Sequence, residues 1–267
     1  MNINSSYTGL QSINDLQSST LEKVGSGLAI NKASDDASGL AIATNLGVEK
    51  SSISQSIENM NSGIAMANIA QSGVSSQKEI LENIKTETLK AMNGTMSQDD
   101  RDIIANKISK YIEQYDNIAN STTYNGNSLL KTDGTTSDDI SIVDEESTIG
   151  MEKADTLSVS DTLKAALTNF SSDSGARESM LKAVDSGTDK LASYASDYGS
   201  AANAMMSSAR NSISTEKEIA SAQSTILEID YSKEVSNFSK TNIMSQIGYA
   251  MQSQANAAQA RNIALLS

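Results

Sequence analysis

The sequence predicts a mainly α-helical fold: a long antiparallel helical bundle or coiled-coil rod with a small β-hairpin region, in which the N- and C-terminal helices pair. Three observations support this prediction. The chain of 267 residues contains no proline, so no proline interrupts its helices. Apolar residues recur at steps of three and four over stretches much longer than most globular helices. Aromatic residues make up only 4% of the chain, which leaves Leu, Ile, Val, Met and Ala to form a core of closely packed helices.

The first amphipathic stretch lies at the N-terminus. Its apolar residues fall on one narrow stripe, closer to a coiled-coil seam than to the face of a globular helix. They are Ile3, Tyr7, Leu10, Ile13 and Leu16, with Leu21, Val24 and Leu28 beyond. Residues 25–27 (Gly-Ser-Gly) end the pattern, and an irregular connector is expected as far as Ser34. From this stretch alone, an ordinary amphipathic helix folded back on its own domain is an equal alternative.

Two further helices and a tight hairpin are expected next. The apolar periodicity from Leu40 to Met92 predicts a very long helix that ends at Asn93 and Gly94. Residues 97–100 (Ser-Gln-Asp-Asp) resemble a capping box and predict the start of a third helix that runs to about residue 118. Residues 123–130 (TYNGNSLL) predict two short strands joined by an Asn-Gly turn.

Residues 132–161 differ in composition from the rest of the chain. They contain nine acidic residues and one basic residue. Short runs at 140–143 and 157–159 predict strands, so we expect small exposed hairpins on an outward face. The carboxylates are scattered rather than set at the spacing of an EF-hand, which favours a solvated charged segment over an ion site.

Long helical patterns return after this segment. They cover residues 162–170 and then about 178–229. The last part of the chain carries a second narrow apolar stripe: Val235, Phe238, Ile243, Met244, Ile247, Met251, Ala255 and Ala258, followed by Leu265 and Leu266. The two ends therefore mirror each other. A single such helix is marginal in water, so each stripe needs the other, or copies in other subunits.

The composition excludes several classes of function. The chain has no cysteine and no histidine, which removes thiolate chemistry and the commonest general base and metal ligand. Its net charge of −13 disfavours partners such as nucleic acid and anionic membranes. We expect no catalytic residue, cofactor or metal site. No membrane-spanning stretch or cleavable signal is expected either, which taken alone indicates a cytoplasmic protein.

Asp35 and Asp36 permit three interpretations. Two acids without a third ligand nearby are a poor metal site. Adjacent helix positions point about 100° apart, so the two carboxylates are a poor catalytic pair. The favoured interpretation is a helix start, in which Ser34 or Asp35 caps the helix and Asp36 lies in the favourable field of its first turn. The small residues that follow, including Gly39, would let Leu40 and Ile42 pack between subunits or against other helices.

These residues resemble bacterial flagellins. Residues 25–43 (GSGLAINKASDDASGLAIA) are similar to the family pattern SSG-L-IN-A-DDAAGLAIA. The TYNG turn and Leu129-Leu130 are similar to T-F-NG---L, residues 229–234 (IDYSKE) to DADYA-E, and residues 252–256 (QSQAN) to AQAN. The resemblance covers both ends and most of the middle. It indicates a short form that lacks the large outer domains of long flagellins.

The resemblance implies a domain organisation. Residues 1–34 and 232–267 would form an inner core domain of paired terminal helices. Residues 35–130 and 176–231 would form a rod-like outer helical domain, with its hairpin near 121–131. Residues 131–175 would be a short acidic, variable segment that faces outward.

The resemblance also implies a function, a location and a set of partners. The chain would be a structural subunit that self-assembles into the flagellar filament for motility. It would be exported through the flagellar type III channel without a cleaved signal and end up outside the cell. Its partners would be copies of itself, the hook-associated junction and cap proteins and a flagellin export chaperone. The expected self-assembly residues are Ile3, Tyr7, Leu10, Ile13, Leu16, Asp35, Asp36, Gly39, Leu40, Ile42, Val235, Phe238, Ile243, Ile247, Met251, Leu265 and Leu266.

The sequence departs from the family where animal Toll-like receptors grip many flagellins. The family pattern LQR-RELA-Q reads LENIKTETLK at residues 81–90, so Asn83 replaces an arginine and Glu87 a leucine. Gln114 replaces a glutamate on the next helix. Loss of an arginine from the centre of an interface can weaken the free energy of binding by several kcal/mol. We therefore expect weak or absent receptor activation.

Three other functions were weighed against the filament subunit. A flagellin-like hook–filament junction protein shares the paired terminal helices and is the main alternative. An enzyme, such as a metalloprotease carried in the outer region, would need histidine, which the chain lacks. A generic coiled-coil scaffold is disfavoured by the Asn-Gly hairpin and the acidic segment.

Overall fold

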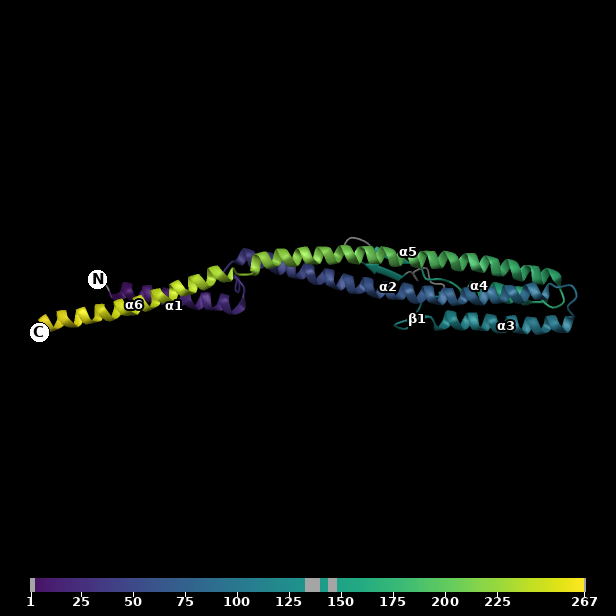
Figure 1. The fold of residues 1–267 in the computed structure, drawn as a ribbon, viewed down its shortest axis with the longest axis horizontal. Helices are drawn as coiled ribbons and strands as arrows, with labels where there is room; N and C mark the ends of the chain where they lie inside the picture. The colour runs from purple at the N-terminus through teal and green to yellow at the C-terminus, as the bar shows by residue number, and fades with distance from the viewer. Residues whose placement is uncertain (1–2, 133–139, 144–147, 267) are drawn as a thin grey trace. The chain divides into compact units, whose positions relative to one another are not determined.

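The computed structural model describes residues 3–132, 140–143 and 148–266, with side chains described for residues 9–132, 141–142 and 148–261. This part of the chain is mainly helical, which confirms the predicted fold class (Figure 1). Its elements in order are α1 (Ile3–Ser26), α2 (Ala37–Ala91), α3 (Gln98–Ser121), β1 (Thr123–Tyr124), β2 (Asn127–Ser128), β3 (Ile140–Val143), β4 (Thr148–Met151), α4 (Leu157–Leu167), α5 (Ser174–Leu227) and α6 (Tyr231–Leu266).

The contacts divide the chain into two compact units. The terminal unit consists of Met1–Ser51 and Glu216–Ser267, and the middle unit of Ser52–Thr215. Helices α2 and α5 contribute residues to both units. The boundaries predicted near residues 34 and 231 remain a prediction.

In the middle unit, α2 and α5 pair antiparallel and share a continuous core with α3 and α4. Lys85 donates to Asp185 across the α2–α5 pair at 2.7 Å. Nearer the start of this part of α2, Gly63 lies against Met205 and Ile142, and a Cβ at this glycine would approach the Met205 sulfur to 2.4 Å. The absent side chain at residue 63 therefore allows α2, α5 and the β3 strand to approach closely.

Two local predictions are confirmed in the middle unit. The Ser97 side chain accepts a hydrogen bond from the Asp100 backbone N–H and donates to the Asp100 carboxylate, so it caps α3. Strands β1 and β2 pair antiparallel around Asn125 and Gly126. Both turn residues have positive φ, 48° and 82°, as this kind of two-residue turn requires.

The acidic segment is folded differently from the prediction. β3 is found at the expected residues, but the strand expected at 157–159 is wrong, because these residues begin α4 and β3 pairs with β4 instead. The physical reason is that Val159 and Leu163, one helical turn apart, are both buried on the same helix face. The expectation of wholly exposed hairpins is also wrong, because Ile142 and Met151 are buried.

Buried hydrogen bonds join the two ends of this acidic segment. The Tyr198 hydroxyl donates to the Leu129 carbonyl oxygen at 3.2 Å and accepts from the Ala154 backbone N–H at 3.0 Å. Thr156 donates to the Leu130 carbonyl oxygen through both its hydroxyl and its backbone N–H. Residues 129–130, before the acidic segment, are therefore held next to residues 154–156, at its end.

Candidate self-assembly surface

The Asp35-Asp36 pair holds the connector and starts α2. The Asp36 carboxylate accepts from the backbone N–H groups of Ser38 and Gly39 at 3.0 and 2.9 Å, so Asp36 is the residue that caps the helix. The prediction that Ser34 or Asp35 caps it is wrong by one or two positions.

Asp35 has a different role in the same connector. Its carboxylate accepts from the backbone N–H groups of Asn31 and Lys32 at 3.0 and 2.9 Å. These two hydrogen bonds hold the pKa of Asp35 below its usual value. The carboxylate is engaged in the turn before α2, which is why it does not reach the helix terminus. Both acids thus serve local structure rather than chemistry.

A short backbone bridge joins the two connectors of the terminal unit. The Ala29 N–H donates to the Leu227 carbonyl oxygen, and the Ile229 N–H donates to the Gly27 carbonyl oxygen. The Tyr231 hydroxyl adds a hydrogen bond to the Val24 carbonyl oxygen at 3.0 Å. This bridge cannot be predicted from the sequence, since nothing local in either connector marks a pairing partner about 200 residues away.

Helices α1 and α6 pair antiparallel through small and polar side chains. Leu10 lies against Gly248, and a Cβ added to Gly248 would approach the Cδ2 atom of Leu10 to 2.7 Å. Asn14 donates to the Tyr249 hydroxyl at 3.2 Å. Among the side chains described on these helices (residues 9–26 and 231–261), the other buried positions are Thr20, Thr241 and Ser245. The paired terminal helices are as predicted, and three of the four buried side chains described on the pair are polar.

The apolar stripe of α6 remains largely in solvent. Ile243 is 57% exposed, Ile247 50% and Met251 66%. We call the four neighbouring side chains Ile243, Met244, Ile247 and Met251 the α6 stripe. Further exposed apolar side chains of the terminal unit are Leu16, Leu21, Ile42, Val48, Tyr231, Val235 and Tyr249. Exposed apolar patches are typical of protein–protein contact sites, so these side chains form the candidate self-assembly surface.

The remaining predicted self-assembly residues are placed as follows. Ile13, Leu40 and Phe238 are half-buried, while Leu10 and Gly39 are buried. The side chains of Ile3, Tyr7, Leu265 and Leu266 lie outside the described residues. The role of the whole set in self-assembly remains a prediction.

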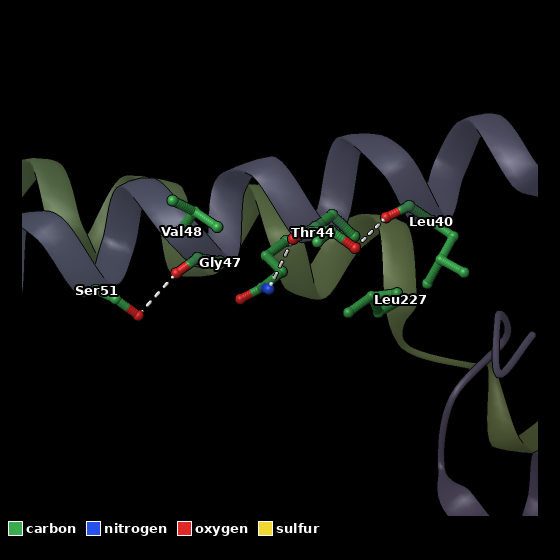
Figure 2. Close-up of a pocket in the computed structure, with 8 residues that line it drawn as sticks. Leu40, Thr44, Gly47, Val48, Ser51 and Leu227 are labelled. Carbon is green, nitrogen blue, oxygen red and sulfur yellow. Dashed lines mark hydrogen bonds between the residues drawn. The ribbon is translucent and has the colours of Figure 1, made fainter.

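A groove lies beside the start of α2 in the terminal unit. Figure 2 shows Leu40, Val48 and Leu227 around it, and its volume is about 410 Å³. The hydroxyls of Thr44 and Ser51 donate to carbonyl oxygens one turn earlier in their own helix, as the dashed lines show. The polar groups are therefore satisfied locally, and the groove offers apolar surface without a reactive side chain.

The predicted receptor-contact positions lie in the middle unit. Asn83 and Gln114 are exposed. Glu87 is buried, and its carboxylate accepts from Lys90 at 3.0 Å and from Lys107 of α3 at 2.8 Å. The hydrogen bond from Lys107 is the main cause that lowers the pKa of Glu87. Glu87 thus joins α2 to α3.

The described part of the chain contains neither a metal-binding cluster nor a membrane-spanning helix. Among residues 3–132, 140–143 and 148–266, no group of three or more potential ligands could hold a metal ion. Within the same ranges, no helix has an apolar stretch of the length that a bilayer requires.

Together, the long paired helices and the exposed apolar stripe define a helical structural protein. Comparison with known families is consistent with this class. Residues 1–135 match the N-terminal helical region of bacterial flagellin, and residues 181–266 match its C-terminal helical region. The chain therefore belongs to the bacterial flagellin family.

Individual relatives extend this result over the whole chain. Flagellin of Bacillus subtilis is 29% identical over 96% of both chains. Flagellin B of Helicobacter pylori is 40% identical, but the match spans 48% of this chain and only 25% of that protein. The match to the first of these spans nearly the full length of both sequences.

Two solved structures are also similar to the chain. The crystal structure of Bacillus cereus flagellin aligns with a TM-score of 0.52 and 25% identity, over 58% of this chain and 88% of that one. A structure assigned to a flagellar hook-associated protein of Vibrio parahaemolyticus aligns with a TM-score of 0.65 over 73% of this chain and all of that one. At 16% identity, this second likeness concerns the fold alone.

Proposed function

We propose that this chain self-assembles into the flagellar filament by burying the exposed apolar side chains of α1 and α6 against other copies of itself. One observation carries the proposal: the α1–α6 pair buries Thr20, Thr241 and Ser245 while Ile243 and Ile247 stay exposed. Burying an exposed Ile or Met fully is worth roughly 1.5–3 kcal/mol. Several such side chains per subunit are enough to drive polymerisation.

The same energetics favour coupled folding and assembly. A helix pair with a mainly polar interface gains little free energy to offset the backbone entropy it loses, about 1–2 kcal/mol per residue. The terminal helices are therefore largely unfolded in the free subunit and become fully ordered in the filament. The middle unit, which has its own core, remains folded throughout.

Truncation tests this proposal. Removing residues 1–30 or 240–267 is expected to abolish growth on filament seeds, measured by sedimentation, while circular dichroism still reports a helical middle unit. The matched control is Gln246→Ser, a change at an exposed polar position of α6. A truncated chain that still sediments as filament would contradict the proposal. Electron microscopy separates the main alternative, since a hook–filament junction protein would form no long tubes.

The remaining partners follow from the family. The C-terminal stripe, before assembly, is the surface for a flagellin export chaperone, and the filament ends meet the hook-associated junction and cap proteins. Export occurs unfolded through the flagellar type III channel without a cleaved signal, so the assembled protein is extracellular. The lack of cysteine suits passage through a narrow channel. Co-purification of the chaperone with wild type, but not with a chain lacking residues 240–267, tests the first of these interactions.

Activation of flagellin-sensing Toll-like receptors is weak or absent. Asn83 and Gln114 are exposed, but they lack the charges that the family has at these positions. The Glu87 carboxylate is already paired with Lys90 and Lys107, and so is not free to bind a receptor. A reporter-cell assay with purified monomer tests this, and potency near that of a typical enteric flagellin would refute it.

A further inference from the structure

Two members of the α6 stripe are methionines, and both are open to solvent. The Met244 side chain is 54% exposed and that of Met251 is 66% exposed. The chain contains no cysteine, histidine or tryptophan. A mild oxidant of the peroxide class therefore meets no thiol and reacts first with accessible thioethers.

The two methionines lie where a polar change would matter. They are seven residues apart, two helical turns, and so share one face of α6. Ile243 and Ile247 lie beside them and are also half or more exposed. Methionines thus supply two of the four side chains of the α6 stripe.

Exposure separates these methionines from those of the core. Met60, Met180 and Met205 are completely buried in the middle unit. Burial protects a thioether because the oxidant must reach the sulfur. These buried methionines are therefore expected to stay unoxidised and serve as controls within the same chain.

We propose that Met244 and Met251 are a modification site at which a peroxide oxidant reversibly blocks assembly; this inference rests on the proposed function. The thioether sulfur attacks one peroxide oxygen, a sulfur–oxygen bond forms, and the oxygen–oxygen bond breaks. The departing hydroxide takes the proton and leaves as water. Sulfur loses two electrons and the peroxide is reduced.

The consequence for assembly follows from polarity. A sulfoxide converts a flexible apolar side chain into a polar one, and burying it in a subunit interface without a hydrogen-bond partner is unfavourable. Oxidised subunits therefore add poorly to a filament, whereas subunits already incorporated have both sulfurs covered and are protected. Methionine sulfoxide reductases, which reverse the reaction, restore competence.

The experiment uses full-length monomer and hydrogen peroxide. Oxidation is mapped by peptide mass spectrometry, and growth is measured by sedimentation on sheared filaments. The test variant is Met244→Leu with Met251→Leu, which keeps the stripe apolar. The matched control is Met92→Leu with Met206→Leu, which removes two exposed methionines of the middle unit.

The expected result has four parts. Met244 and Met251 oxidise before the buried methionines, and more slowly in filaments than in monomer. Peroxide raises the critical concentration of wild type and of the control variant about tenfold, a penalty of about 1.4 kcal/mol. The Leu variant polymerises normally before and after peroxide. A mixture of both reductase types, one for each sulfoxide epimer, restores growth of oxidised wild type.

Contrary outcomes separate this inference from the proposed function. The proposed modification site is contradicted if wild type with both sulfurs oxidised grows like untreated protein, or if peroxide stops the Leu variant equally. Neither result contradicts the proposed self-assembly surface. Equal oxidation rates in monomer and filament would also overturn the site. If untreated wild type does not add to seeds, the proposed function fails and this inference fails with it.

Discussion

The middle and terminal units use the same kind of helix in opposite ways. In the part of the chain with described side chains, the largest fully buried side chains, among them Leu81, Tyr115 and Tyr198, all lie in the middle unit. The described part of the terminal helix pair instead buries Leu10 together with threonine and serine, and it exposes isoleucine and methionine. The middle unit therefore has a core of its own, whereas the terminal unit leaves apolar side chains exposed, which under the proposed function are buried by neighbouring copies.

The largest expected effect comes from making the α6 stripe polar. Ile243 and Ile247 are about half exposed, so changing both to Ser removes roughly 1.5–3 kcal/mol of further burial in an assembled filament. Each buried Ser hydroxyl without a partner costs roughly 1–3 kcal/mol more, so the total loss exceeds about a hundredfold in affinity. We expect growth on seeds to be lost in a sedimentation assay. The thermal midpoint of the middle unit should not move, because neither side chain contacts its core. Unchanged growth would mean that the stripe does not make the contact between subunits.

The reverse result is expected from the core of the middle unit. Leu81 is fully buried and lies against the Gly187 region of α5. The change Leu81→Ala should lower the free energy of unfolding by about 2–5 kcal/mol, through lost burial and a residual cavity. Urea denaturation followed by circular dichroism measures this. The exposed position Ile103→Ala is the control and should lose less than about 1 kcal/mol. Equal losses would contradict the contrast in burial.

Local features of the middle unit could be predicted from the sequence, because their partners lie a few residues away. The Ser97 cap and the Asn125-Gly126 turn are recognisable from residue type and spacing. The cap of α2 was missed by a short distance because two adjacent carboxylates compete for nearby N–H groups, and local sequence does not rank them. The mistaken strand at 157–159 has the same origin, since three residues carry too little periodicity to distinguish strand from helix.

The pairing of the two terminal helices could be predicted, but the residues that meet in this pair could not. The apolar stripe of α6 was recognisable, but not that its pairing with α1 would bury Thr241 and Ser245. Which face of a helix turns to its partner depends on the fit with residues more than 200 positions away, such as Leu10 against Gly248. The Leu28–Glu228 bridge is likewise invisible to periodicity.

A smaller effect is expected where the acidic segment closes on the middle unit. Tyr198→Phe removes the hydroxyl that pairs with Leu129 and Ala154, leaving a buried carbonyl and a buried N–H without this partner. We expect a loss of about 1–3 kcal/mol in the free energy of unfolding. Tyr194→Phe is the matched control, because its hydroxyl accepts only the Asp155 N–H and is less buried. A control loss as large as the Tyr198 loss would show that burial of the hydroxyl does not set the effect.

The smallest effect concerns the ion pairs of Glu87 and should appear only in the middle unit. The pKa of Glu87 is lowered from 4.5, mainly by the Lys107 hydrogen bond, so folding favours the charged carboxylate. Its contribution is fully present above pH 4.5 and is lost as the pH falls through the lowered value in the folded state. The change Glu87→Gln should therefore cost about 1 kcal/mol near pH 7, and the difference from wild type should shrink on acidification below pH 4.5. Thermal unfolding at several pH values measures this, with the exposed Glu82→Gln as control. Residues of α6 take no part in the ion pairs of Glu87 with Lys90 and Lys107, so growth of the Glu87→Gln variant on seeds at pH 7 should be unchanged. A variant that unfolds normally but fails to grow would place Glu87 at a contact between subunits instead.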